Sequence, residues 1–151
     1  MKPAAIAFVG KIRAAHPPDH ARIAELAGQL SYPSTTAEIA RRLQGIESSP
    51  AAAVFVAELE TGEIAGWIAV FVYRTVEADA RAEVSGLVVD ERFRSRRVGE
   101  HLLARAEEWA RENGCHAIGL RSNVIRDRAH AFYERHGYAH VKTQKALRKQ
   151  L

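Results

Sequence analysis

An arginine-rich segment that leads into a helical pattern is the first feature of this sequence that could do chemistry. Residues 92–97 contain four arginines, and Gly99 follows them inside an amphipathic stretch at 98–113. The first turn of a helix carries backbone N–H groups without intrahelical acceptors, and the helix dipole adds partial positive charge there. The segment therefore favours binding of a phosphate group. A solvated basic loop and a nucleic-acid contact are the alternatives, but the sequence contains no nucleic-acid-binding motif.

A second motif lies at residues 129–138, which read Ala-His-Ala-Phe-Tyr-Glu-Arg-His-Gly-Tyr. Together the two segments resemble the acetyl-CoA-binding core of the GNAT (Gcn5-related) N-acetyltransferases. The first is similar to the family pattern Q/R-x-x-G-x-G/A, beginning here at Arg94. The second is similar to A-x-x-F-Y-E-x-x-G-F/Y, beginning at Ala129. A wider pattern that includes residues 83–89 and 122–126 resembles aminoalkylphosphonate N-acetyltransferases and other members that act on small amines.

The resemblance implies acetyl-CoA as co-substrate, with its pantetheine arm lying along the strand at 87–89 and its pyrophosphate at the arginine-rich segment. Arg97 stands where the family has a glycine, so it would be strained if that position needs a positive φ. An outward-pointing Arg97 could instead add an ion pair to the cofactor. Asn123 could bind the cofactor or cap the next helix. The cofactor-binding residues implied are Leu87, Val88, Val89, Arg94, Ser95, Arg96, Arg97, Val98, Gly99, Glu100, Asn123 and Arg126.

Acetyl transfer to an amine needs a base that removes a proton from the amine and an acid that protonates the departing thiolate. Glu83 lies 11 residues before Arg94, the offset of the catalytic glutamate in histone-type members, and we predict that it is the general base. Tyr133 matches the family's general-acid tyrosine. The alternatives are a charge at the rim of the site for Glu83 and a packing role for Tyr133. Direct attack on the thioester needs no enzyme nucleophile, so Cys115 is expected to be a small buried side chain.

The leading interpretation is an acetyl-CoA-dependent N-acetyltransferase that acts on a primary amine of a small molecule. A protein Lys or N-terminal acetyltransferase and a non-catalytic acyl-CoA-binding regulator stay open as alternatives. No metal, nucleic-acid or membrane partner is predicted, and the resemblance leaves a homodimer open without locating an interface. The acceptor site is expected to be walled by the first two helices and the central strands. Candidates by location are Tyr32, Glu38, Tyr73 and Glu77.

The elements that position these residues follow from hydrophobic periodicity and turn signals. They predict one α/β domain over residues 1–151, in the order β-α-α-β-β-β-α-β-α-β. Its mixed, largely antiparallel sheet would carry helices on both faces. Thr35 and Glu38 form a capping-box pattern. Residues 1–10 are a lead-in or short extra strand. The predicted strands are 11–14, 53–59, 64–76, 82–89, 117–120 and 138–143, and the predicted helices are 19–30, 35–47, 98–113 and 126–136.

Composition fits a globular domain, with 47% hydrophobic and 26% charged residues among 151. Residues 1–91 hold 8 basic and 12 acidic side chains, whereas residues 92–151 hold 14 and 6. We interpret this asymmetry as two half-sites, an acidic one for a cationic amine and a basic one for CoA phosphates. Cys115 is the only cysteine, and the longest apolar stretch, 65–73, is too short to span a membrane. A cytoplasmic location is therefore expected.

Overall fold

The computed structural model of the protein describes residues 8–151, which divide into two compact units. The first unit ends at Leu120 and the second runs from Arg121 to Leu151. Most of the lead-in expected at 1–10 lies outside the described residues. No helix within residues 8–151 is both long and apolar enough to cross a membrane.

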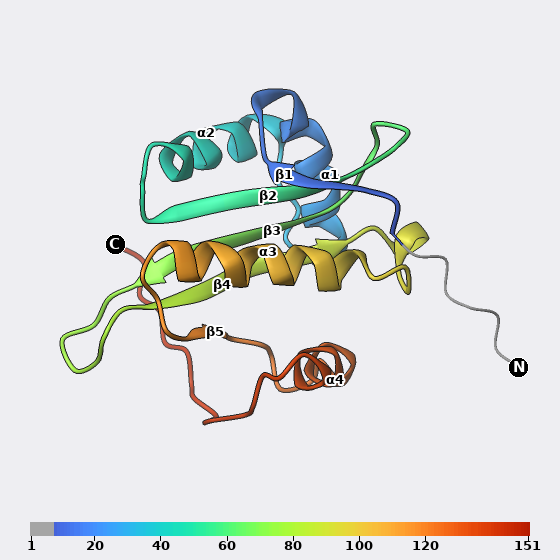
Figure 1. The fold of residues 1–151 in the computed structure, drawn as a ribbon. Coiled ribbons are helices and arrows are strands. Elements are labelled where there is room, and N and C mark those ends of the chain that lie inside the picture. The colour runs from blue at the N-terminus through green and yellow to red at the C-terminus, as the bar shows by residue number, and fades with distance from the viewer. Residues whose placement is uncertain (1–7) are drawn as a thin grey trace, which may run out of the picture. The chain divides into compact units, whose positions relative to one another are not determined.

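The first unit is built around a five-stranded sheet in the order β1-β2-β3-β4-β5 (Figure 1). Strands β1 to β4 pair antiparallel, and β5 pairs parallel with β4. Short 3₁₀ helices precede α1 and follow β4. The elements are β1 (Gly10–Ala14), η1 (Pro17–Asp19), α1 (His20–Gln29), α2 (Thr36–Glu47), β2 (Ala52–Leu59), β3 (Ile64–Tyr73), β4 (Arg81–Val89), η2 (Glu91–Phe93), α3 (Val98–Glu112) and β5 (Ile118–Leu120).

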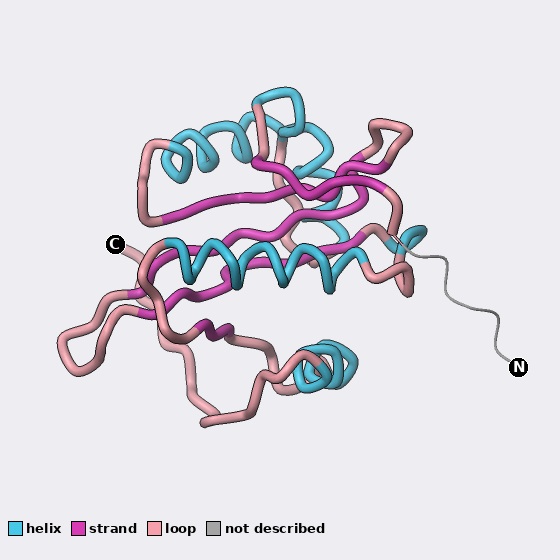
Figure 2. The backbone as a smooth tube through the Cα atoms, viewed as in Figure 1, coloured by secondary structure: helices cyan, strands magenta, loops and turns pink. Residues whose placement is uncertain are grey.

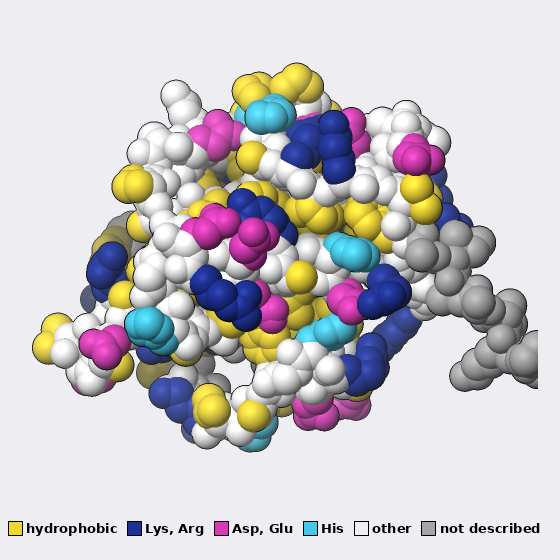
Figure 3. Space-filling view, in the orientation of Figure 1, with side chains coloured by type: hydrophobic (Ala, Val, Ile, Leu, Met, Phe, Trp, Pro, Cys, Tyr) yellow, Lys and Arg dark blue, Asp and Glu magenta, His cyan; other side chains and the backbone are white. Residues whose placement is uncertain are grey.

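Helices cover both faces of this sheet, with α1 and α2 on one face and α3 on the other (Figure 1). Helix α3 approaches β3 closely, because a Cβ atom added at Gly66 would lie 3.2 Å from Cδ1 of Leu102. Charged and histidine side chains cover the solvent side of α3 across the centre of Figure 3. On the other face, β2, β3 and β4 pack against α1 and α2. That core comprises Ala15, Ile23, Ala24, Leu26, Ile39, Leu43, Val54, Val56, Ile64 and Val88.

The capping box predicted at the start of α2 is confirmed. The Glu38 backbone N–H donates to Oγ1 of Thr35 at 3.1 Å, and the Thr35 N–H donates to Oε2 of Glu38 at 2.8 Å. These two bonds satisfy N–H groups that the helix itself leaves without acceptors. The helix therefore begins where the sequence predicted, after the Ser31–Ser34 interruption.

The second unit contains one helix, α4 (Asp127–Arg135), followed by Gly137 at φ 90°. Its aromatic residues pack on one another, with the Tyr133 ring centroid 5.2 Å from that of Phe132 and 5.7 Å from that of Tyr138. The predicted α/β class and element order are thus confirmed through α4. The last predicted strand, 138–143, is wrong: residues 139–151 contain no strand, and Val141 is 86% exposed. Its short alternating pattern finds no partner strand to complete a hydrogen-bond ladder.

Candidate active site

The edge of β4 is open where β5 stops. Strand β5 pairs only with Ala82, Glu83 and Val84, so the β5 side of β4 has no strand partner beyond Val84 within the described residues. Figure 2 shows β5 as a short strand beside one end of β4. An unpaired strand edge presents backbone N–H and C=O groups that can pair with an extended ligand. Leu87, Val88 and Val89, the predicted pantetheine contacts, occupy this open part.

A β-bulge at Ser85 marks the start of the open edge. Val84 pairs with Val70, but the next pair joins Gly86 to Ala69, so Ser85 is an extra residue without a partner in β3. The bulge bends the strand and shifts the alternation of its side chains. Ser85 itself is exposed, and its hydroxyl lies 3.4 Å from the carbonyl oxygen of Ala69.

Trp67 lies across β4 immediately after the bulge. A Cβ atom at Gly86 would come within 2.8 Å of Cζ3 of the Trp67 ring, so any larger residue would require the indole to move. The indole Nε1 is buried and has no hydrogen-bond partner within the described residues. Gly86 and Trp67 therefore pack closely against each other next to the bulge.

Glu83 is a buried carboxylate, only 8% exposed, in the part of β4 just before the bulge. It pairs across the sheet with Phe71, and side chains of cross-strand partners share a face. The next pair on the same face is Tyr73 with Arg81. Trp67 also lies on this face, which is the one that α1 and α2 cover. Glu83 therefore sits beside an aromatic surface formed by β3.

Arg97, at the entry to α3, has a left-handed backbone with φ 66° and ψ 15°. Ser95 also has a positive φ, 65°. The strain foreseen for an arginine at this position is therefore present. The Arg97 guanidinium points to the first turn of α3, where Nε and Nη2 donate to the Glu100 carboxylate at 2.7 and 2.8 Å.

The remaining residues of the arginine-rich segment surround the start of α3. The first intrahelical bond runs from the His101 N–H to the Arg97 carbonyl, at 3.1 Å. The N–H groups of Val98, Gly99 and Glu100 precede this first helical donor, so they have no acceptor within the helix and point out of its end. Exposed Arg94 and half-buried Arg96 flank this end. These groups meet the requirements of a phosphate site.

We expect Arg97→Gly to raise the melting temperature by about 2 °C, because glycine adopts a positive φ without a Cβ clash. Arg97→Ala is the matched control, since it also removes the ion pair with Glu100 but keeps the Cβ atom. It should lower the melting temperature. Differential scanning fluorimetry of the two variants makes the comparison, and a glycine variant no more stable than the alanine variant would show that the backbone there is unstrained.

An ion-pair network fixes the turn between β4 and this segment. Asp90 is 2% exposed and accepts hydrogen bonds from the Arg92 backbone N–H at 2.9 Å, from the Arg92 guanidinium and from Arg22 of α1. Hydrogen bonding to Arg92, with a further bond from Arg22, holds the pKa of the Asp90 carboxyl well below its ordinary value. Asp90 therefore stays ionised and ties the end of β4 to α1.

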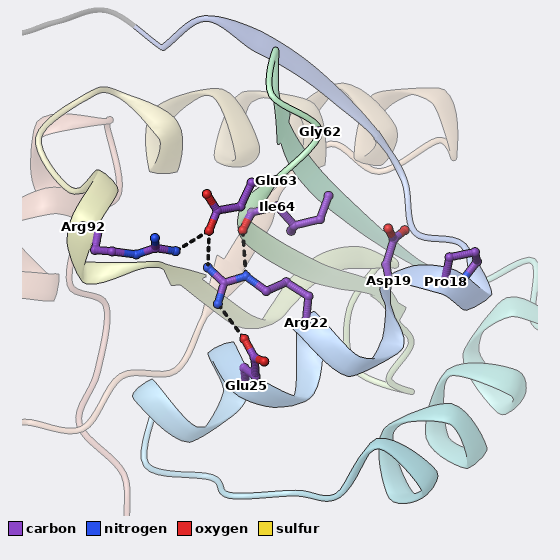
Figure 4. Close-up of a pocket in the computed structure, with 8 residues that line it drawn as sticks. All are labelled: Pro18, Asp19, Arg22, Glu25, Gly62, Glu63, Ile64 and Arg92. Carbon is purple, nitrogen blue, oxygen red and sulfur yellow. Dashed lines mark hydrogen bonds and ion pairs between the residues drawn. The ribbon is translucent and has the colours of Figure 1, made fainter.

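The same arginines line a shallow pocket of about 470 Å³ between α1 and the β2–β3 turn. Figure 4 shows that its charged side chains pair with one another: Arg22 with Glu25 and Glu63, and Arg92 with Glu63. Because these charges already satisfy one another, the pocket supports the fold and is not the candidate acceptor site.

The second unit contains the other predicted site residues, Asn123, Arg126 and Tyr133. Burial raises the pKa of Tyr133 above its ordinary value, although the positive charge of Arg126 opposes this. The phenol therefore stays protonated at neutral pH. The side-chain oxygen of Asn123 accepts a hydrogen bond from the Ile125 N–H at 3.2 Å. The backbone carbonyl of Asn123 accepts a second one from the Arg126 N–H at 3.0 Å. Asn123 thus shapes the turn into α4.

The structure brings Glu83, residues 87–89 and the arginine-rich segment together along β4 and its exit. Of the acceptor residues named by location, Tyr73 alone shares the face of Glu83 in β3 and β4. Tyr32 is 68% exposed, Glu38 is held in the capping box, and Glu77 lies in the exposed β3–β4 turn. The sequence reasoning missed the bulge, although Ser85-Gly86 within a Val- and Leu-rich strand is a signal for one.

The comparison with known families agrees with this geometry. The model of the acetyltransferase (GNAT) family matches residues 10–138. The chain belongs to this family. It is also 38% identical over 92 residues to the aminoalkylphosphonate N-acetyltransferase of Salmonella typhimurium. That match covers 59% of this chain and 60% of the relative, which is less than two thirds of the relative's length.

Solved structures of other GNAT proteins have the same fold. Glucosamine-6-phosphate N-acetyltransferase from Arabidopsis thaliana superposes with a TM-score of 0.79 at 26% identity, covering 93% of this chain and 98% of that one. A transcriptional regulator from Bacillus halodurans C-125 also gives a TM-score of 0.79 at 26% identity, with 94% and 99% covered. The resemblance identified from the two motifs is therefore confirmed at the level of family and fold.

Proposed function

We propose that this GNAT protein transfers an acetyl group from acetyl-CoA to the primary amine of a small molecule. The observation that carries the proposal is the continuous path from the bulge at Ser85 along the open edge of β4 to the start of α3. An extended pantetheine arm would pair with the open strand edge, and a pyrophosphate would meet helix N–H groups and arginines. Because the family model spans 10–138, we regard both units as parts of one acetyltransferase domain.

In this proposal Glu83 accepts the proton that the ammonium form of the acceptor must lose before the amine can attack the thioester carbon. The C–N bond then forms and the C–S bond breaks, without a covalent enzyme intermediate. Tyr133 donates a proton to the departing thiolate, and the second amine proton, which the nitrogen loses as the amide forms, replaces it on the phenol. Burial raises the pKa of Tyr133 and keeps the phenol protonated, which supports this role. Among residues 8–151 no group of three or more His, Cys, Asp or Glu side chains is arranged to hold a metal ion.

Two features favour a small acceptor. Glu83 is buried on the sheet face that also carries Phe71 and Tyr73, and the relative from Salmonella typhimurium is named for aminoalkylphosphonates. A non-catalytic acyl-CoA-binding regulator is the second candidate, because one solved relative of similar fold is named a transcriptional regulator. Both candidates bind acetyl-CoA, and turnover separates them.

Binding is tested by thermal denaturation with 1 mM acetyl-CoA. A ligand at about 100 times its Kd contributes about 2.7 kcal/mol to the stability of the native state. For a domain of this size the melting temperature should therefore rise by about 5 to 10 °C. AMP and duplex DNA are the controls and should leave it unchanged. No rise with millimolar acetyl-CoA would contradict the proposed function and its regulator alternative alike.

A further inference from the structure

Arg81 is a half-buried arginine whose charge is not paired with a carboxylate among residues 8–151. Its guanidinium carbon lies 4.5 Å from the centre of the Tyr73 ring, and within the described residues this is the one interaction of its side chain. In contrast, Arg13, Arg22 and Arg92 each pair with carboxylates. Partial removal of a cation from water costs free energy when no anion lies beside it. Binding of an anion at such a cation is therefore favourable.

Stacking on Tyr73 leaves the guanidinium able to bind. A cation–π contact uses the face of the planar group, whereas its N–H donors point outward in the plane and match the oxygens of an oxyanion. Arg96 has the same setting, with its guanidinium carbon 5.4 Å from the centre of the Phe93 ring, in the segment proposed to bind pyrophosphate. Arg81 therefore has the character of an anion-binding residue.

Arg81 lies on the same face of β4 as Glu83. The two positions are two residues apart in a strand and before the bulge, so their Cα atoms are about 6.6 Å apart and their side chains point the same way. Their cross-strand partners, Tyr73 and Phe71, form a continuous aromatic surface with ring centroids 6.2 Å apart. Arg81, which can bind an anion, and Glu83, which can bind a cation, thus lie side by side on the face that carries Tyr73 and Phe71.

We propose that Arg81 binds an anionic group on the acceptor, so that the preferred acceptors carry a primary amine and a carboxylate, phosphonate or phosphate joined by a short carbon chain. This inference rests on the proposed function, because it places the reacting amine at Glu83. Arg81 then selects the acceptor and fixes its orientation. The side chain takes no part in the proton transfers.

The test compares three acceptors by the rate of CoA thiol release: n-propylamine, 3-aminopropionate and 2-aminoethylphosphonate. The wild-type protein should use the two anionic amines with a kcat/KM about 10-fold or more above that of n-propylamine. The ratio between the carboxylate and the phosphonate identifies which oxyanion the site prefers. Equal use of all three acceptors would overturn the inference.

Arg81→Met keeps much of the apolar length of the side chain but removes the charge. It should lower kcat/KM for the anionic amines about 10-fold, mainly through KM, and leave n-propylamine unchanged. Arg81→Lys keeps the charge and should retain more activity than Arg81→Met. Arg74→Met, in the exposed β3–β4 turn, is the matched control for loss of net charge and should behave as wild type. A uniform loss on all three acceptors, or equal losses in the Met and Lys variants, would show that Arg81 is merely structural.

Calorimetric binding of 3-aminopropionate and 2-aminoethylphosphonate in the presence of CoA, where no acetyl group is available, separates this inference from the proposed function. Binding that weakens about 10-fold in Arg81→Met supports the inference even if acetyl-CoA gives no thiol release, in which case only the proposed function fails. Absence of binding of both probes to the wild-type protein overturns the inference. Release of CoA thiol with n-propylamine as acceptor, but with neither anionic amine, would also overturn the inference and leave the proposed function standing.

Discussion

Replacing Glu83 with glutamine is expected to lower kcat/KM for the acceptor amine by at least about 100-fold, the usual contribution of a general base. Glutamine keeps the shape of the side chain and its place on β4 opposite Phe71. It removes the ability to accept a proton from the ammonium group. Alkylamines are almost entirely protonated at neutral pH, so the reaction depends on that proton transfer.

The defect of Glu83→Gln should shrink as the pH rises, because a growing fraction of the acceptor is then already unprotonated and needs no base. The measurement is kcat/KM from pH 6.5 to 9.5, with thiol release as the signal. Glu77→Gln, in the exposed β3–β4 turn, is the control and should follow the wild-type profile. If Glu83→Gln also keeps the wild-type profile and rate, Glu83 is not the base and its carboxylate has another role.

Tyr133→Phe is expected to lower kcat about 100-fold while leaving the affinity for acetyl-CoA unchanged. The substitution removes only the hydroxyl, and the ring contacts with Phe132 and Tyr138 that hold α4 against the following turn remain. Burial raises the pKa of Tyr133, so the wild-type phenol should stay protonated and active into the alkaline range. The loss should therefore be present across neutral pH.

Steady-state kinetics and calorimetric binding of acetyl-CoA test this second prediction together. Tyr32→Phe removes a hydroxyl from a side chain that is 68% exposed and serves as the control. A variant at Tyr133 with unchanged kcat would remove this residue from the acid role. A variant that instead loses acetyl-CoA affinity would indicate that the hydroxyl binds the cofactor.

Most of the fold was predictable because its signals are local. The amphipathic stretch at 98–113 and the capping box at Thr35 each depend on residues a few positions apart, and the elements begin and end close to where the patterns place them. The strand expected at 138–143 failed because a strand needs a partner, and a short alternating pattern does not supply one. Hydrophobic periodicity alone therefore predicted one strand more than the five of the observed sheet.

The candidate site was predictable where it depends on motifs and not where it depends on register. The arginine-rich segment and Tyr133 are contiguous in sequence with the patterns that identify them. The pairing of Arg81 with Tyr73 and of Glu83 with Phe71 depends on how β3 and β4 align, and the bulge at Ser85 sets that alignment. A shift of one residue would move every one of these side chains to the other face.

The backbone conformation at Arg97 is another feature that the sequence motifs could not predict. The departure from the family's glycine was visible in the sequence, but two outcomes were open, an outward ion pair to the cofactor or a strained backbone. The positive φ and the bidentate contact with Glu100 within the chain show that strain is present and that the charge already has a partner. Only the conformation of the turn could distinguish these outcomes.

The most direct test of the central claim is mass spectrometry of the small molecules formed when the protein is incubated with acetyl-CoA and primary amines. We predict an amine heavier by one acetyl group, with one equivalent of CoA thiol released per product and no product without the protein. Thiol release without an acetylated amine, or acetyl-CoA that binds and stays intact with every amine, would contradict the account.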